Sequence, residues 1–120
     1  MTEYIVLIPD NEAAWAEAEE ADRQRVYDRH REFAQALADR GHKVTAGAEL
    51  TPSAQARTVR SEGGELRVTE GPYAESVEQL SGFDLIESDD LDDLLACVGI
   101  LADGDGGLEV RACADGSAGG

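Results

Sequence analysis

Apolar side chains recur every three or four residues from Ala21 to Arg40, and this spacing predicts an α-helix. One histidine stands among them: the series is Val26, His30, Phe33, Ala34 and Leu37. These positions fall on one face of a helix, while charged residues occupy the other faces. Gly41 follows directly, as glycine commonly does where a helix ends. His30 is therefore expected on the inward face of the helix.

The same spacing returns near residue 90 and predicts a second helix. Its apolar positions are Leu91, Leu94, Leu95 and Val98. Aspartates precede or occupy its first turn: Asp89, Asp90, Asp92 and Asp93. Negative charge is favoured there by the positive end of the helix dipole. We interpret these carboxylates as a helix cap and a solvated face, because the spacing of a calcium-binding loop is absent.

Continuous or alternating apolar runs predict the strands. Tyr4–Ile8 is uninterrupted and is expected to end at Pro9, and His42–Leu50 alternates. Further strands are expected at 56–60, 66–68, 82–87 and 108–112, and Gly63-Gly64 is typical of a hairpin turn between the first two. The composition of 74–80 predicts a short helix, and 11–20 is expected to be a loop or a short helical turn.

This order of elements predicts an α+β fold of ferredoxin-like type, with helices on one face of an antiparallel sheet. The 120 residues suffice for one domain, which we place at 1–114, and the small, polar residues 115–120 are expected to be a disordered tail. A sheet covered on one side must cover its second face. A homodimer is therefore expected.

Charge excludes several classes of partner. The chain carries 26 acidic against 10 basic Lys and Arg side chains, a formal net charge of −16. Such a chain repels nucleic acid and anionic lipid, and no basic patch opposes that repulsion. The sequence has no apolar run long enough for a membrane helix, and its first residues resemble a strand more than a signal peptide. We expect a cytoplasmic protein that binds neither nucleic acid nor membrane.

Sequence motifs for cofactors and metals are absent. The chain contains no GxGxxG, P-loop or GxSxG text, so no nucleotide cofactor or serine-hydrolase elbow is expected. Cys97 and Cys113 lack CxxC spacing and are expected to be reduced structural thiols. The cysteines and the histidines, His30 and His42, show no zinc spacing, so no metal site is expected.

The most specific stretch is 68–90, which reads VTEGPYAESVEQLSGFDLIESDD. Gly71-Pro72 breaks a strand there and places Glu70 and Tyr73 beside a tight turn. The stretch resembles the signature of the YCII-related proteins, in particular their DGPF group: V-T-D-G-P-F-A-E-x-K-E-Q-L-G-G-F-Y-L-I-E-V-D-D-L-D-E-A. The spacing is kept from Val68 to Asp92. The resemblance implies a dimeric α+β barrel, although most members of the family have no assigned reaction.

The resemblance also implies a His–Asp pair in a cleft. His30 falls at the histidine of the family's first helix, in a text resembling H-x-x-F-A. Glu70 stands where the signature has aspartate, and it is longer by one methylene group. Tyr73 replaces the usual phenylalanine and adds a hydroxyl group. We therefore take His30 and Glu70 as candidate catalytic residues, and three aromatic residues as candidate substrate contacts: Tyr73, Phe83 and Trp15.

Structural interpretations stay open beside these roles. A histidine on an apolar helix face is often a satisfied core residue, a carboxylate at a turn often accepts nearby backbone N–H bonds, and Trp15 is typical of an anchor against the domain. Two functions follow. The first is a cofactor-independent acid–base enzyme that eliminates, isomerises or hydrolyses a small molecule. The alternative is a non-catalytic module that binds a small ligand or regulates a partner, since DGPF-type proteins are often encoded beside sigma factors of the extracytoplasmic-function class.

Overall fold

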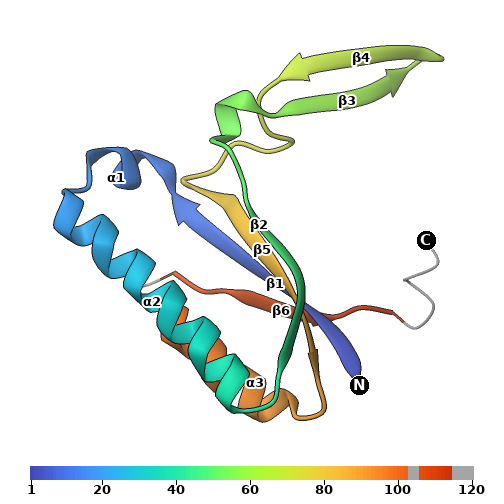
Figure 1. Ribbon diagram of the computed structural model, residues 1–120. Coiled ribbons are helices and arrows are strands. Elements are labelled where there is room, and N and C mark those ends of the chain that lie inside the picture. Colours follow the sequence, from blue (N-terminus) through green and yellow to red (C-terminus); the bar gives the residue numbers. More distant parts are fainter. Residues whose placement is uncertain (103–105, 115–120) are drawn as a thin grey trace.

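The computed structural model describes residues 1–102 and 106–114, and its main body is a sheet with helices on one face (Figure 1). The predicted disordered tail, 115–120, and part of the predicted turn at 104–107 lie outside the described residues. The elements are β1 (Thr2–Asn11), α1 (Glu12–Glu17), α2 (Glu20–Asp39), β2 (Lys43–Glu49), a 3₁₀ turn (Ser53–Gln55), β3 (Arg57–Glu62), β4 (Glu65–Glu70), β5 (Glu78–Ser88), α3 (Leu91–Val98), a second 3₁₀ turn (Gly99–Leu101) and β6 (Glu109–Ala112).

The main sheet has four antiparallel strands in the order β2-β5-β1-β6. Figure 1 shows α2 and α3 side by side against one face of this sheet. The core lies between these layers and consists of Val6, Phe33, Leu37, Ile86, Leu94, Cys97 and Val98. The predicted α+β fold of ferredoxin-like type is thus confirmed, because apolar stripes of the two helices cover the sheet as their spacing indicated.

Strand alternation assigns the residues of β1 and β5 to two faces. Val6 lies opposite Asp84 and Tyr4 opposite Ile86, and this set faces the helices. The alternate residues face away from α2 and α3, and they are half-buried: Ile5, Leu7, Phe83 and Leu85. Within the described residues the helices cover only the first face.

Two sequence-based boundaries were wrong. Pro9 does not end the first strand, because a bulge between Ile8 and Pro9 lets β1 continue to Asn11. The short helix expected at 74–80 is absent, and β5 begins inside it at Glu78. Glu78 pairs with Asn11 across the extended β1, while Val77 stays largely exposed. A helix over 74–80 would bury no apolar face, so the pairing of β5 with the longer β1 forms instead.

The strands β3 and β4 form a separate hairpin that extends away from the main sheet (Figure 1). Gly63 and Gly64 both have positive φ, as the predicted turn between them requires. At the base of the hairpin, Gly71 donates its N–H to the carbonyl of Ala56 over 2.8 Å, and the Thr58 hydroxyl donates to the carbonyl of Gly71. This places Glu70 on an arm outside the body.

The helix α1 was expected only as a loop or short helical turn. Its first turn is capped by Asn11, whose side-chain oxygen accepts the N–H of Ala14 over 3.0 Å. Trp15 then packs edge-on against Tyr27 of α2, with ring centroids 5.7 Å apart. Arg23 lies over the indole and donates to the carbonyl of Trp15. Across the described residues, every helix is too short or too polar to cross a bilayer.

Candidate active-site pocket

A cavity of about 900 Å³ lies where α1 and α2 meet the ends of β1, β2 and β5. Three of the five residues expected from the sequence line it: Trp15, His30 and Phe83. Further lining groups include carboxylates and an aromatic ring: Asp10, Glu12, Tyr27, Glu49, Glu78 and Asp84. Phe83 precedes Asp84 on β5, so its side chain is directed to the opposite face of the sheet.

Asp84 is the carboxylate that His30 influences. It occupies the helix-facing side of β5, directly opposite Val6. Burial raises the pKa of the Asp84 carboxyl above its usual value, and the charge of His30 acts in the opposite direction. A desolvated carboxyl beside an imidazole is an arrangement that can exchange a proton with a bound molecule.

Gly47 provides the space that this carboxyl occupies. It lies on β2 directly opposite Asp84 of β5. A Cβ at position 47 would collide with Oδ1 of Asp84 and would meet the carbonyl of Phe83 at 3.0 Å. Any side chain there would force the carboxyl to move. The sequence places glycine where two strands and a carboxylate must approach closely.

The lining of the cavity contains further acidic groups. The pKa of Asp10 is raised by burial and also by the neighbouring charges of Glu12 and Glu78, against a lowering hydrogen bond from the backbone of Asn11. Glu12 differs, because it accepts hydrogen bonds from the hydroxyl and the N–H of Ser53, which lower its pKa. The cavity therefore contains both a satisfied carboxylate and desolvated ones.

Glu70 and Tyr73 do not lie in this cavity. Glu70 lines a second hollow, which lies beside the base of the hairpin, and its carboxylate lies 3.8 Å from the guanidinium of Arg57. Tyr73 is 83% exposed, with Arg60 over its ring. The hairpin carries Glu70 away from α2, so the expected His30–Glu70 pair does not form within one chain, and Asp84 is the carboxyl whose pKa the charge of His30 lowers.

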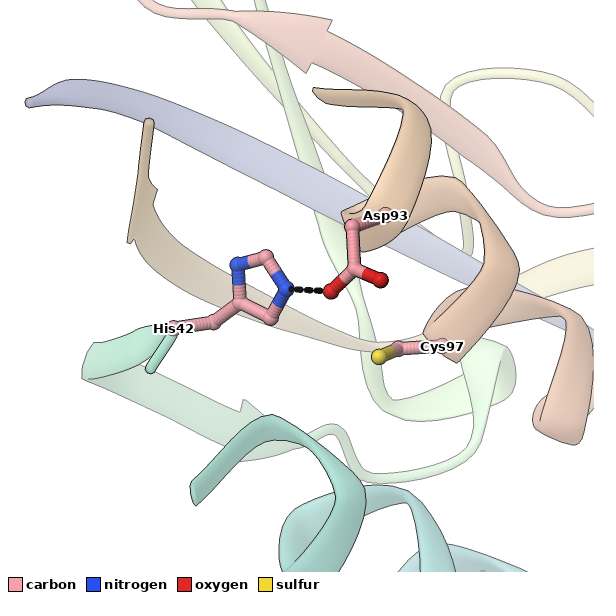
Figure 2. Close-up of side chains that lie close together, drawn as sticks. All are labelled: His42, Asp93 and Cys97. Atoms are coloured by element: carbon pink, nitrogen blue, oxygen red, sulfur yellow. Dashed lines mark hydrogen bonds and ion pairs between the residues drawn. The ribbon is translucent and has the colours of Figure 1, made fainter. Parts of the chain in front are cut away.

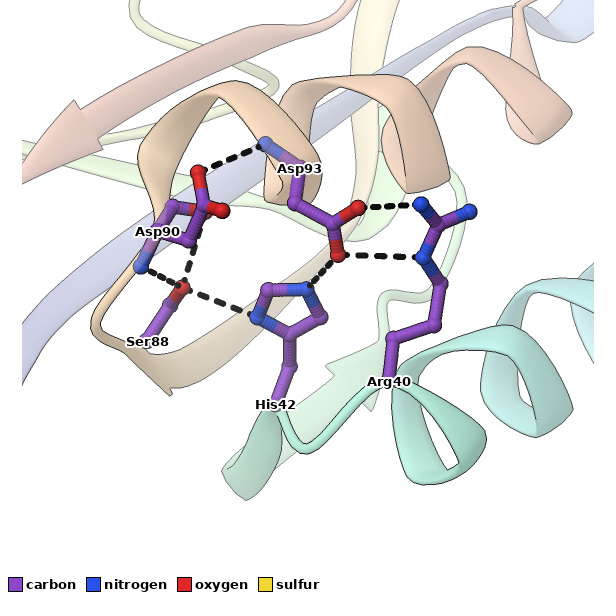
Figure 3. A network of polar contacts seen from close by, with 5 residues as sticks. All are labelled: Arg40, His42, Ser88, Asp90 and Asp93. Carbon is purple, nitrogen blue, oxygen red and sulfur yellow. Dashed lines mark hydrogen bonds and ion pairs between the residues drawn. The ribbon is translucent and has the colours of Figure 1, made fainter.

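A second constellation lies at the other end of α2 (Figure 3). His42 is buried, and its Nε2 lies 2.7 Å from Oδ2 of Asp93, while its Nδ1 lies 2.8 Å from Oγ of Ser88. Arg40 donates from Nε and from a terminal nitrogen to the two oxygens of Asp93. The hydrogen bond from His42 is the chief cause of a lowered pKa at Asp93, and Arg40 adds to it. This carboxylate is thus ionised and saturated with donors.

Sequence reasoning missed the role of His42. The turn that ends α2 directs it inward: Gly41 has a φ of +80° and the N–H of His42 donates to the carbonyl of Leu37 over 3.0 Å. Ser88 is only 1% exposed and bonds the backbone of Asp90 through its hydroxyl. A substrate cannot reach that hydroxyl, so the Asp–His–Ser contact is not a hydrolytic triad.

Comparison with known proteins places the chain in a family. An uncharacterized protein of Rhizobium meliloti (strain 1021) is 45% identical to it over 53 residues, which are 44% of this chain and 43% of that protein. The matched part is thus less than half of either chain. The family model described as "YCII-related domain" matches residues 2–99, which include β1 to α3 and both histidines. The chain belongs to the YCII-related domain family.

Proposed function

We propose that the cavity beside α2 binds a small molecule and performs acid–base chemistry on it without a cofactor. His30 transfers the proton, and Asp84 orients the imidazole and balances its charge. The observation that carries this proposal is the placement of the desolvated Asp84 carboxyl within the influence of His30 in a cavity large enough for a ligand.

The properties of the two groups support this division of roles. Imidazole can take or give a proton near neutral pH, and a neighbouring carboxylate stabilises its charged form. Burial disfavours the ionised form of Asp84, so proton exchange with a neighbour is easier than for a solvated aspartate. Proton abstraction from a carbon next to a carbonyl is common to elimination and isomerisation, and the same pair can activate water for hydrolysis.

Glu70 and Tyr73 would contribute only if a second copy of the chain placed its hairpin beside the cavity. The half-buried sheet face formed by Ile5, Leu7 and Leu85 supports a homodimer, because helices do not cover it among the described residues. We expect Leu85→Glu to yield monomers in light scattering after size-exclusion chromatography. A dimer of unchanged stability would exclude this face as the interface.

The acid–base proposal can be tested before the substrate is known. Small keto acids and lactones are incubated with the protein in D₂O, and NMR follows exchange of the protons next to the carbonyl. We expect exchange of at least one compound by the wild type, with loss in His30→Gln and in Asp84→Asn. The matched control is Glu32→Gln, an exposed carboxylate of α2 that does not line the cavity, which keeps the rate.

Two results would change the function that we assign to the cavity. Equal exchange by wild type and His30→Gln would remove His30 from the chemistry. Binding of compounds with no exchange would favour the alternative, a small-ligand-binding or regulatory module. The acidic and aromatic lining of the cavity suits a ligand in either case.

A further inference from the structure

His42, Asp93 and Cys97 present three different metal-binding atoms to one small volume. The imidazole nitrogen, the carboxylate oxygen and the thiol sulfur all lie within 4.8 Å of one another. Asp93 and Cys97 are four residues apart on α3 and therefore lie on one side of that helix, and His42 approaches from the chain just before β2. Figure 2 shows the three side chains converging. We propose that this cluster is a binding site for a divalent transition metal, with zinc as the best fit.

The donor set selects the kind of metal. Imidazole and thiolate together favour zinc and related ions over Mg²⁺ and Ca²⁺, which prefer oxygen ligands. Tetrahedral zinc places its ligand atoms about 3.3–3.7 Å apart, given bond lengths of about 2.0–2.3 Å. Nε2 of His42 and Oδ2 of Asp93 are closer than this, at 2.7 Å, while the three ligand atoms all lie within 4.8 Å of one another. Side-chain movements of about 1 Å would open the first pair and bring the thiol to a metal-ligand distance. Three protein ligands leave a fourth position for water.

A hydrogen bond with Ser88 already orients the histidine. Ser88 fixes one ring nitrogen, so the other faces Asp93 and Cys97. Metal-binding histidines are commonly held in this way by a polar group on the far nitrogen. Arg40 donates to both oxygens of Asp93, and its bond to Oδ1 can remain when Oδ2 turns to a metal.

The protons of the site can be balanced. Arg40 directs N–H groups at both oxygens of Asp93, as at a carboxylate, so Nε2 of His42 donates to it and Nδ1 accepts from the Ser88 hydroxyl. When a metal takes Nε2, the ring proton moves to Nδ1 and is donated to Ser88, whose own hydroxyl donates instead to the carbonyl of Asp90, 3.1 Å away. The thiol proton of Cys97 leaves to solvent as the metal–sulfur bond forms. One proton is released, and the thiolate and carboxylate neutralise the two charges of the metal.

The site is separate from the proposed active site, since none of its three ligands lines the large cavity. It links the end of α2 to α3, the two helices that cover the core. A bound ion would therefore tie these helices together and stabilise the folded chain. This inference does not depend on the acid–base proposal.

Cobalt(II) is the direct probe, because a cobalt–thiolate bond adds an intense near-ultraviolet absorption. The reduced, chelator-treated protein is titrated with Co²⁺ and then with Zn²⁺. We expect the thiolate band to saturate at one Co²⁺ per chain, to vanish when Zn²⁺ displaces the cobalt, and to be absent in Cys97→Ser. The matched control is Cys113→Ser, which removes the other free cysteine and keeps the band.

Further variants separate ligand loss from misfolding. Asp93→Asn and Ser88→Ala are compared with the wild type by circular dichroism before titration. Ser88→Ala should bind cobalt about tenfold more weakly while keeping the thiolate band, because a metal-bound histidine that loses its hydrogen-bond partner binds the metal less tightly. A folded wild type without a saturable thiolate band, or a band that persists in Cys97→Ser, would overturn the proposal.

Discussion

The two histidines of this chain lie twelve positions apart, and their surroundings differ in kind. His42 is buried with both ring nitrogens bonded, and its partner Asp93 has a lowered pKa because donors surround it. His30 is half-buried in a cavity, and its neighbour Asp84 has a raised pKa because burial disfavours the charged form of its carboxyl.

The surroundings of the two carboxyl groups determine where chemistry can occur. A carboxylate with a complete set of donors is stable as an anion and resists change, so the His42 cluster holds elements together or holds an ion. A desolvated carboxyl remains open to a new partner, so the His30 cavity is the place for a ligand. Residue type alone does not separate the two sites, since both combine histidine with aspartate.

We expect the largest loss of folding stability from a substitution in the cluster around His42. His42→Ala removes one hydrogen bond from the buried hydroxyl of Ser88 and one from the carboxylate of Asp93. We expect it to lower the free energy of unfolding by about 1–3 kcal/mol, because each of the two lost bonds contributes about 0.5–1.5 kcal/mol. His30→Ala is the matched change at the cavity, and it should cost about 0.5 kcal/mol or less if that site is not structural. Urea denaturation measures the free energy of unfolding of both variants. Equal losses would show that the two histidines do not differ in their structural role.

Gly47→Ala should disturb the cavity through a collision and not through lost contacts. The added Cβ would displace the carboxyl of Asp84. We expect a destabilisation of about 1–3 kcal/mol, as for other overpacked positions, together with loss of proton exchange. Gly99→Ala is the control, because a Cβ there meets nothing within 4 Å, its φ is −54° and it does not line the cavity. Equal exchange rates in both variants would show that the carboxyl is not needed where it lies.

Asp84→Asn should raise stability slightly near neutral pH. The folded pKa of Asp84 is above its unfolded value, so the stability that its protonated form supplies is complete below about 3.8 and is lost as the pH rises through the folded pKa. An amide avoids that loss. Thermal melts at several pH values should therefore show the variant gaining on the wild type as the pH increases. A constant difference across this range would mean that burial does not shift Asp84.

Much of the fold could be predicted because its signals are local. The stripes from Val26 to Leu37 and from Leu91 to Val98, and the turn at Gly63-Gly64, need only neighbouring residues to be recognised. The prediction of a short helix at 74–80 was wrong, because the structure of this segment depends on the pairing of Glu78 with the distant residue Asn11. The composition of a segment does not reveal its pairing with a strand 67 positions away.

The sites were harder to predict for the same reason. Asp84 is an ordinary residue within a predicted strand, and only the fold brings it to His30 and opposite Gly47. His42 and Cys97 show no zinc spacing, because their segments are brought together by the packing of α2 against α3. The resemblance to the family indicated His30, but it paired this residue with Glu70. The hairpin places Glu70 in a different hollow. Membership in the YCII-related family was correctly inferred from the stretch at 68–92.

The most direct test of the His30–Asp84 pair is the titration of the Asp84 carboxyl by carbon NMR in three proteins. These are the wild type, His30→Gln and Glu70→Gln. Removing the positive charge of His30 should raise the pKa of Asp84 further, since that charge lowers it in the folded protein, while Glu70→Gln should leave it unchanged. An Asp84 titration that is the same with and without His30 would contradict the account.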